Sequence, residues 1–126
     1  MRAVIYSGKL SGSISSIPSK SQAHRLLICA ALSENETRLW LPTVSQDIEA
    51  TCSCLHALGA CFDRSGEELV GHPIDRTSVP RLPLLDCGES GSTLRFLLPV
   101  AAALCKESRF TGHGRLPERP NGPLIE

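Results

Sequence analysis

The chain has 126 residues, and 13 Lys and Arg residues balance 13 Asp and Glu residues at a pI near 6.9. This length permits a single domain with a hydrophobic core of ordinary size, and the balanced charge argues against a nucleic-acid-binding domain. No apolar run approaches the roughly 20 residues that span a bilayer, and the first residues do not have the pattern of a signal peptide. We therefore expect a cytoplasmic protein that binds neither nucleic acid nor a membrane.

Helical and extended patterns alternate along the chain, which predicts an α/β fold. In chain order we expect a strand over 2–7, a Ser- and Gly-rich connector over 8–16, a helix over 21–32, a strand over 37–41, a helix over 46–58, a hairpin of 60–63 with 67–70, a strand near 84–86, a helix over 90–105 and a strand over 108–111. The last four residues resemble the opening of another helix.

The pattern contains a weak internal repeat. Arg25 and Arg95 lie 70 residues apart, and each is followed by an apolar, Ala-rich helix and then a short strand. This predicts one α/β unit that is used twice, with the second copy incomplete.

The first helix opens with Pro18-Ser19-Lys20-Ser21 and carries Arg25 one turn later. The free N–H groups and the positive dipole end of a helix start hold anions. Lys20 adds a compact charge, and Arg25 adds a planar fork that suits a phosphate or a carboxylate. Ser21 could both cap the helix and bind a ligand. The alternative is a capped surface helix with two solvated cations.

A second helix start of this kind is Gly88-Glu89-Ser90-Gly91-Ser92-Thr93, followed by Arg95. Glycines let an anion approach the backbone, and hydroxyl groups add donors. The segment lacks the Lys of a P-loop, which disfavours a nucleotide kinase. A serine-hydrolase turn would need Gly at position 92, and the sequence places no His beside Ser90. A purely structural turn remains the alternative.

A third segment, Arg115 to Pro120, is a basic loop between prolines. Arg119 could present its guanidinium to an anion, although the loop could equally be a surface feature with a local ion pair, which stabilises little. The six cysteines do not have zinc-site spacing, because Cys52 and Cys54 form a C-x-C pair. We expect buried or incidental free thiols, with Cys29 and Cys105 on apolar helix faces, and no metal.

In this order and at these spacings, the three segments resemble the enolpyruvyl transferase family. The match covers Pro18-Ser19-Lys20-Ser21-x-x-x-Arg25, the Gly88 to Arg95 segment, and Arg115-x-x-Glu118-Arg119-Pro120-x-Gly122-x-Leu124. It favours the members that act on shikimate 3-phosphate over the sister branch that acts on UDP-N-acetylglucosamine.

The resemblance implies two sets of substrate contacts. Ser21 and Arg25 would hold shikimate 3-phosphate. Lys20, Arg119 and the backbone at Gly91 would contact phosphoenolpyruvate, so a bulkier residue at 91 would also crowd a phosphoenolpyruvate mimic such as glyphosate.

The resemblance further implies transfer of the enolpyruvyl group to the 5-hydroxyl of shikimate 3-phosphate, with release of phosphate and no cofactor. Arg95 and Arg115 would be secondary anion contacts. The implied fold is an inverse α/β barrel of repeated βαβαββ units, here incomplete: residues 1–17 would belong to the other domain, and residues 18–126 would form one unit and part of a second.

We expect the acid–base groups to lie downstream of this chain, so that the chain alone is an inactive piece of a monomeric enzyme. The alternative from another class is a non-catalytic module that makes the same anion contacts without turnover.

Overall fold

The computed structural model describes residues 2–14 and 16–124, which form three α-helices, five β-strands and one short 3₁₀ helix. In chain order these are α1 (Lys20–Leu32), β1 (Thr37–Trp40), α2 (Gln46–Ala57), β2 (Cys61–Ser65), β3 (Glu68–His72), β4 (Leu84–Asp86), α3 (Gly91–Leu104), β5 (Arg109–Thr111) and η1 (Gly122–Leu124). From α1 to β5 this order confirms the elements predicted from the sequence.

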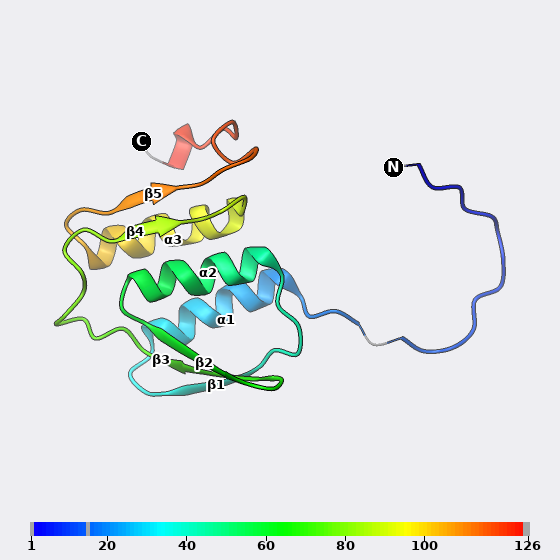
Figure 1. Cartoon of the computed structure of the whole chain (residues 1–126), viewed down its shortest axis with the longest axis horizontal. Coiled ribbons are helices and arrows are strands. Elements are labelled where there is room, and N and C mark those ends of the chain that lie inside the picture. The colour runs from blue at the N-terminus through cyan, green and yellow to red at the C-terminus, as the bar shows by residue number, and fades with distance from the viewer. Residues whose placement is uncertain (1, 15, 125–126) are drawn as a thin grey trace.

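The three helices lie side by side between two small sheets (Figure 1). One sheet is antiparallel, in the order β1-β3-β2, and its β2–β3 hairpin turns at Gly66, whose φ is 62°. The other pairs β4 with β5 in parallel, and α3 makes the crossover between them. The chain thus runs αβαββ and then βαβ. That the second part is an incomplete copy of the first stays a prediction.

The core forms where the apolar stripes of the helices meet the sheets. In α1 the buried positions Ala23, Leu27 and Ala31 recur at helical spacing, so that one face of the helix is apolar. Leu55 of α2 and Leu97 of α3 are fully buried against the same cluster. This packing fixes the three helix starts relative to one another.

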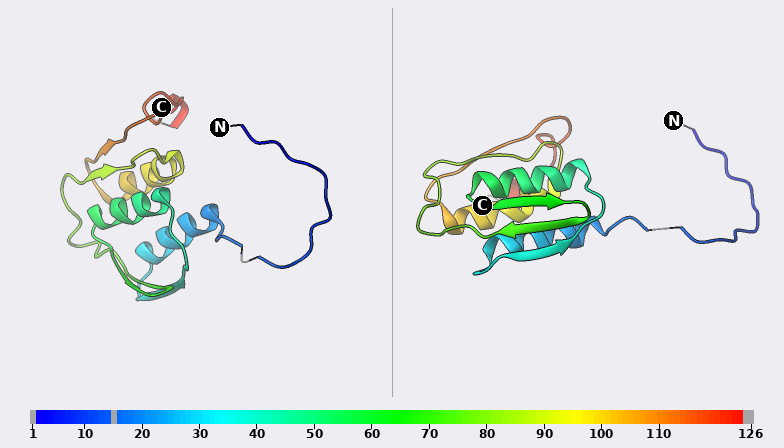
Figure 2. Two further views of the ribbon diagram at one scale, coloured as in Figure 1. Left: turned by 45° about the vertical axis from the view of Figure 1, so that its right-hand side comes forward. Right: turned by 60° about the horizontal axis from the view of Figure 1, so that its bottom comes forward.

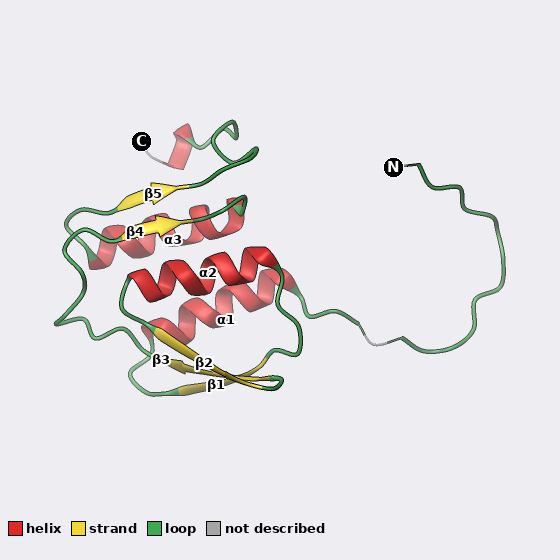
Figure 3. Cartoon of the chain, in the orientation of Figure 1, coloured by secondary structure: helices red, strands yellow, loops and turns green. Residues whose placement is uncertain are grey.

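The predicted strand over 2–7 is wrong as a local structure. Residues 2–14 contain no strand, and Ile5 and Tyr6 are 92% and 86% exposed. Figures 2 and 3 show this segment as a loop that extends away from the helices and sheets. A strand needs a partner for its backbone groups, and no described residue pairs with this segment. That residues 1–17 belong to another domain stays a prediction.

Two smaller expectations also change. Cys29 is exposed rather than buried, because Leu27, Ala30 and Ala31 occupy the inward face of α1 and turn position 29 outward. At the other end, the predicted helix opening is the 3₁₀ turn η1, and residues 125–126 lie outside the described residues.

Candidate anion-binding site

The start of α1 is capped by Ser19, two residues earlier than the Ser21 cap that the sequence indicated. The Ser19 hydroxyl accepts a hydrogen bond from the Gln22 amide at 3.4 Å, and α1 begins at Lys20. The expectation that Ser21 caps the helix is therefore wrong: Ser21 lies inside the first turn and is exposed. No acidic residue occupies that turn, so its dipole end remains available to an anion.

The start of α3 has the same design. Ser90 is the N-cap, and its hydroxyl accepts from the Thr93 amide at 3.2 Å. Gly88 turns the chain toward the helix with a φ of 55° while its amide donates to the Asp86 carboxylate at 3.0 Å. This first turn also contains no acidic residue.

The third basic segment folds back over the start of α3. The His113 amide donates to the Gly88 carbonyl at 2.9 Å, and Leu116 is buried beneath the loop. As a result, a Cβ atom placed on Gly91 would lie only 2.6 Å from a terminal nitrogen of Arg119. Two residues that are 28 positions apart and were predicted to share a ligand are thus neighbours.

The Lys20 ammonium forms an ion pair with the carboxylate of Asp47, in the first turn of α2. The pair is partly exposed, so the lysine is oriented without being removed from solvent. Asp47 also lines a hollow of about 410 Å³ between the start of α2 and the loop before α3. The hollow is lined by Gln46, Asp47, Ala50, Cys87, Gly88, Glu89 and His113.

Arg25 reaches from α1 to α3. Its guanidinium carbon lies 5.0 Å from the ring centroid of Phe96, and one of its terminal nitrogens donates to the Ser21 carbonyl at 2.8 Å. Ser21 and Arg25, predicted to share a ligand, are therefore in direct contact through the backbone. Arg95 and Arg115 are exposed, and among the described residues neither forms an ion pair.

A buried chain of polar side chains joins the starts of α1 and α3. His24 Nδ1 lies 2.7 Å from the Thr51 hydroxyl, which lies 2.7 Å from that of Thr93, and the Thr93 hydroxyl donates to Ser90 Oγ at 2.7 Å. Asp47 completes the chain, because its carbonyl accepts from both threonines at 3.2 Å. All four side chains are at most 1% exposed.

The surroundings of His24 favour its neutral form. Burial lowers its pKa from the ordinary value of 6.5, and the nearby positive charge of Lys20 lowers it further. Ser90 is a buried N-cap whose hydroxyl bonds to Thr93. These bonds argue against Ser90 as a serine nucleophile. Sequence reasoning missed Thr51 and Asp47, because both lie on α2 and nothing in their spacing connects them to the starts of α1 and α3.

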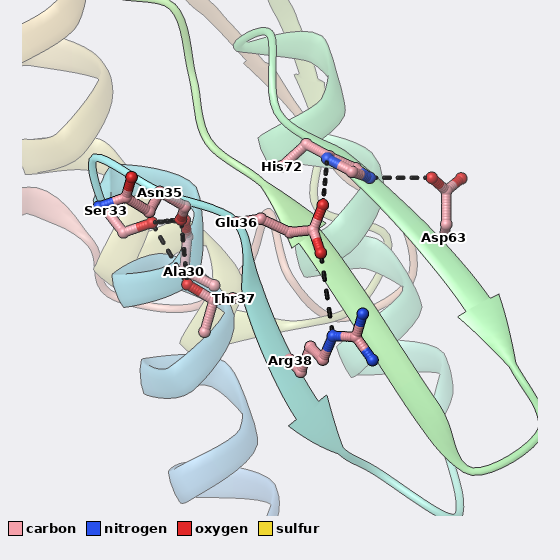
Figure 4. Close-up of polar contacts among 8 residues, drawn as sticks. All are labelled: Ala30, Ser33, Asn35, Glu36, Thr37, Arg38, Asp63 and His72. Atoms are coloured by element: carbon pink, nitrogen blue, oxygen red, sulfur yellow. Dashed lines mark hydrogen bonds and ion pairs between the residues drawn. The ribbon is translucent and has the colours of Figure 1, made fainter.

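Charged side chains at the opposite end of α1 form a different kind of cluster (Figure 4). There Glu36 lies between His72 and Arg38, at 3.6 and 3.9 Å, and His72 lies 3.0 Å from Asp63. These groups are all substantially exposed, so such pairs contribute little stability. Arg38, the arginine of this cluster, already lies 3.9 Å from a Glu36 carboxylate oxygen and 3.8 Å from one of Glu68.

Among residues 2–14 and 16–124, no group of three or more His, Cys, Asp or Glu side chains is arranged to hold a metal ion. None of the helices in this part of the chain has the length and apolar character needed to cross a membrane.

Two helix starts that have no acidic residue in the first turn lie near Lys20, Arg25 and Arg119, an arrangement typical of an anion-binding site. Comparison with protein families makes the assignment specific. The model of the family described as EPSP synthase (3-phosphoshikimate 1-carboxyvinyltransferase) matches residues 5–126. The chain belongs to this family, and the resemblance inferred from its motifs is confirmed.

Individual relatives agree. The chain is 45% identical over 112 residues to the 3-phosphoshikimate 1-carboxyvinyltransferase of Clostridium kluyveri, covering 89% of this chain and 26% of the relative. It is 39% identical over 126 residues to that of Clostridioides difficile, covering 92% of this chain and 29% of the relative. The chain therefore spans little more than a quarter of the length of the curated relatives that it matches.

A solved structure shares the fold. EPSP synthase from Acinetobacter baumannii superposes with a TM-score of 0.75 at 25% identity, covering 86% of this chain and 25% of that one. This confirms the predicted fold class, an incomplete α/β structure of the EPSP synthase type.

Proposed function

We propose that this chain supplies one part of the binding surface for phosphoenolpyruvate and shikimate 3-phosphate in a cytoplasmic, monomeric enolpyruvyl transferase. The observation that carries the proposal is the neighbourhood of Gly91 and Arg119 at the acid-free start of α3. There, backbone N–H groups and a guanidinium fork converge on one place, which is the arrangement that binds a phosphate.

The two substrates take different contacts around the helix starts. Shikimate 3-phosphate takes Ser21 and Arg25 at α1, and phosphoenolpyruvate takes Lys20, the Gly91 backbone and Arg119. Arg95 and Arg115 are secondary anion contacts. The ion pair of Lys20 with Asp47 supports this division, because it holds the lysine on the side of α1 that faces α2 and the hollow next to Gly88.

In the proposed reaction the oxygen of the shikimate 5-hydroxyl attacks C2 of phosphoenolpyruvate and gives up its proton while C3 gains one, and the tetrahedral adduct then loses phosphate from C2 and a proton from C3, which restores the double bond of the enol ether. The cations of this chain neutralise the two phosphates and hold the reactants together, which lowers the barrier by positioning and by electrostatics. We assign the acid–base groups to the part of the relatives that this chain does not match.

Binding to the 126-residue chain tests the proposal. We expect Arg119→Gln to weaken phosphoenolpyruvate and Arg25→Gln to weaken shikimate 3-phosphate, each by about tenfold or more, because each removes a charge-assisted hydrogen bond. Arg38→Gln is the matched control, since Arg38 is equally cationic but lies in the cluster at the other end of α1. Equal losses in all three variants would reject the assigned contacts.

Gly91→Ala tests the carrying observation. An alanine Cβ would displace the flexible guanidinium of Arg119, so we expect weaker phosphoenolpyruvate binding with little change in the free energy of unfolding. Unchanged binding would show that Arg119 does not act at this place.

Turnover separates an enzyme from a non-catalytic binding module. Phosphate release from phosphoenolpyruvate is measured with shikimate 3-phosphate present, first with the chain alone and then with the chain joined to the remainder of a relative. We expect release only in the joined protein. Binding of both substrates without release by the joined protein would favour the non-catalytic module.

A further inference from the structure

Phe96 is an aromatic side chain that the hydrophobic core does not use. It is only half-buried, and it lies outside the core cluster of the described residues. In the sequence Phe96 directly follows Arg95, the last residue of the second predicted anion-binding segment. A phenylalanine side chain does not itself bind an anion. Neither core packing nor direct anion binding therefore explains an aromatic residue at this position.

The guanidinium of Arg25 lies over the face of the Phe96 ring. The guanidinium carbon lies 5.0 Å from the ring centroid, within the range where a cation is attracted to an aromatic face. Among the described residues Arg25 forms no ion pair with a carboxylate, and its other contact is the Ser21 carbonyl at 2.8 Å. The ring and this carbonyl together hold a long side chain that would otherwise sample many rotamers.

The Phe96 ring in turn packs against His24 of α1. The His24 ring meets it edge-on, with the two centroids 6.1 Å apart and an angle of 64° between the planes. His24 in turn is buried and bonded to Thr51 at 2.7 Å. The position of Arg25 is thus set by α3 and by the buried polar chain rather than by α1 alone.

We propose that Phe96 is a positioning residue for Arg25: its ring holds the guanidinium so that the free donors of the fork face the phosphate of shikimate 3-phosphate. This rests on the proposed function, which assigns that phosphate to Arg25. An arginine that is already ordered loses less conformational freedom when the phosphate arrives, so the ring raises affinity without touching the ligand.

The test compares Phe96→Leu, which keeps an apolar side chain but removes the aromatic face, with Phe96→Tyr, which keeps the face. Shikimate 3-phosphate and, separately, phosphoenolpyruvate are titrated onto the 126-residue chain. For Phe96→Leu we expect shikimate 3-phosphate to bind about two- to fivefold more weakly, the range for an exposed cation–π contact, and phosphoenolpyruvate to bind as before. Phe96→Tyr should bind both like the parent chain.

The separation of the two ligands distinguishes positioning from a structural role. If Phe96→Leu merely loosened the packing of α1 on α3, both affinities would fall. In an Arg25→Gln background, Phe96→Leu should change neither affinity, because the group that the ring holds is gone. Urea unfolding of each variant measures any loss of folded protein independently.

The outcomes separate the two proposals. If the parent chain does not bind shikimate 3-phosphate, the proposed function fails and this role fails with it. If the parent binds and Phe96→Leu binds equally well, or if its loss persists in the Arg25→Gln background, only the role of Phe96 is overturned. The NMR signal of the Arg25 side-chain N–H, shifted by the ring in the parent and in Phe96→Tyr but not in Phe96→Leu, should confirm the stacking before any ligand is added.

Discussion

Replacing Thr51 with valine tests the buried chain of polar side chains that joins the starts of α1 and α3. Valine has the shape of threonine but lacks the hydroxyl. In the structure this hydroxyl lies 2.7 Å from His24 Nδ1 and 2.7 Å from the Thr93 hydroxyl. Thr51→Val therefore removes the central link of the chain without creating a cavity.

The expected cost follows from which groups lose their partners. Thr93 keeps its bonds to Ser90 at 2.7 Å and to the Asp47 carbonyl at 3.2 Å. His24 is left with neither ring nitrogen bonded, because its Nε2 already has no partner among the described residues. A buried polar group without a partner costs about 1–3 kcal/mol, so we expect a loss of about 2 kcal/mol, a large part of the 5–15 kcal/mol by which domains of this size are stable.

The assay is urea unfolding at pH 7.5, followed by far-ultraviolet circular dichroism, with Thr43→Val as the control. Thr43 is an exposed threonine in the loop before α2, and its substitution should change the free energy of unfolding by less than about 0.5 kcal/mol. A Thr51→Val variant as stable as the control would refute the reasoning, because it would show that the polar chain contributes no more than an apolar contact of the same shape.

Three further perturbations probe other parts of the molecule. Because the pKa of His24 in the folded state is lowered from 6.5, the unfolded chain binds one more proton below that pH, and the free energy of unfolding should fall between pH 7.5 and 5.5. His24→Gln should make this fall shallower. An equal dependence of stability on pH in both proteins would contradict burial of a neutral imidazole. Gly112→Ala should lower the free energy of unfolding by about 1–3 kcal/mol, because its Cβ would lie 2.8 Å from a backbone carbonyl oxygen. Gly122→Ala is its control: a Cβ at position 122 has no atom within 4 Å, so the free energy of unfolding measured in urea should not change. In the native chain a thiol reagent should modify the exposed Cys29 and Cys61 much faster than the buried thiols, and mass spectrometry that found a buried cysteine labelled first would contradict the packing.

Residue spacing predicted most of the helices and strands because each has a local signal. The stripe of Ala23, Leu27 and Ala31 is visible in the sequence, and so is the apolar run that forms α3. The strand over 2–7 has an equally good local signal, yet the structure contains no strand there. Strand formation depends on a partner that local sequence does not reveal, which is the physical reason that this prediction failed where the helices succeeded.

Some residues of the candidate site could likewise be predicted from the sequence, and others could not. Lys20 and Arg25 stood out because cations near a helix start have a chemical meaning that can be read from spacing. Arg119 stood out only through the family resemblance of the three segments taken together. Thr51 did not, since a threonine in the middle of an amphipathic helix has no such meaning until its neighbours are known. Its partners His24 and Thr93 lie 27 and 42 residues away, and only the packing of three helices brings the three side chains together.

Charges in the first turn explain why two of the three helix starts are available to anions and the third is not. α2 begins with Asp47 and Glu49, whereas α1 and α3 have no acidic residue in the first turn. The carboxylates of α2 already complement its dipole, and Asp47 also orients Lys20 at the neighbouring helix start. The carboxylates of α2 thus complement its own N-terminus, and one of them, Asp47, also orients the lysine that we propose contacts phosphoenolpyruvate at the start of α1.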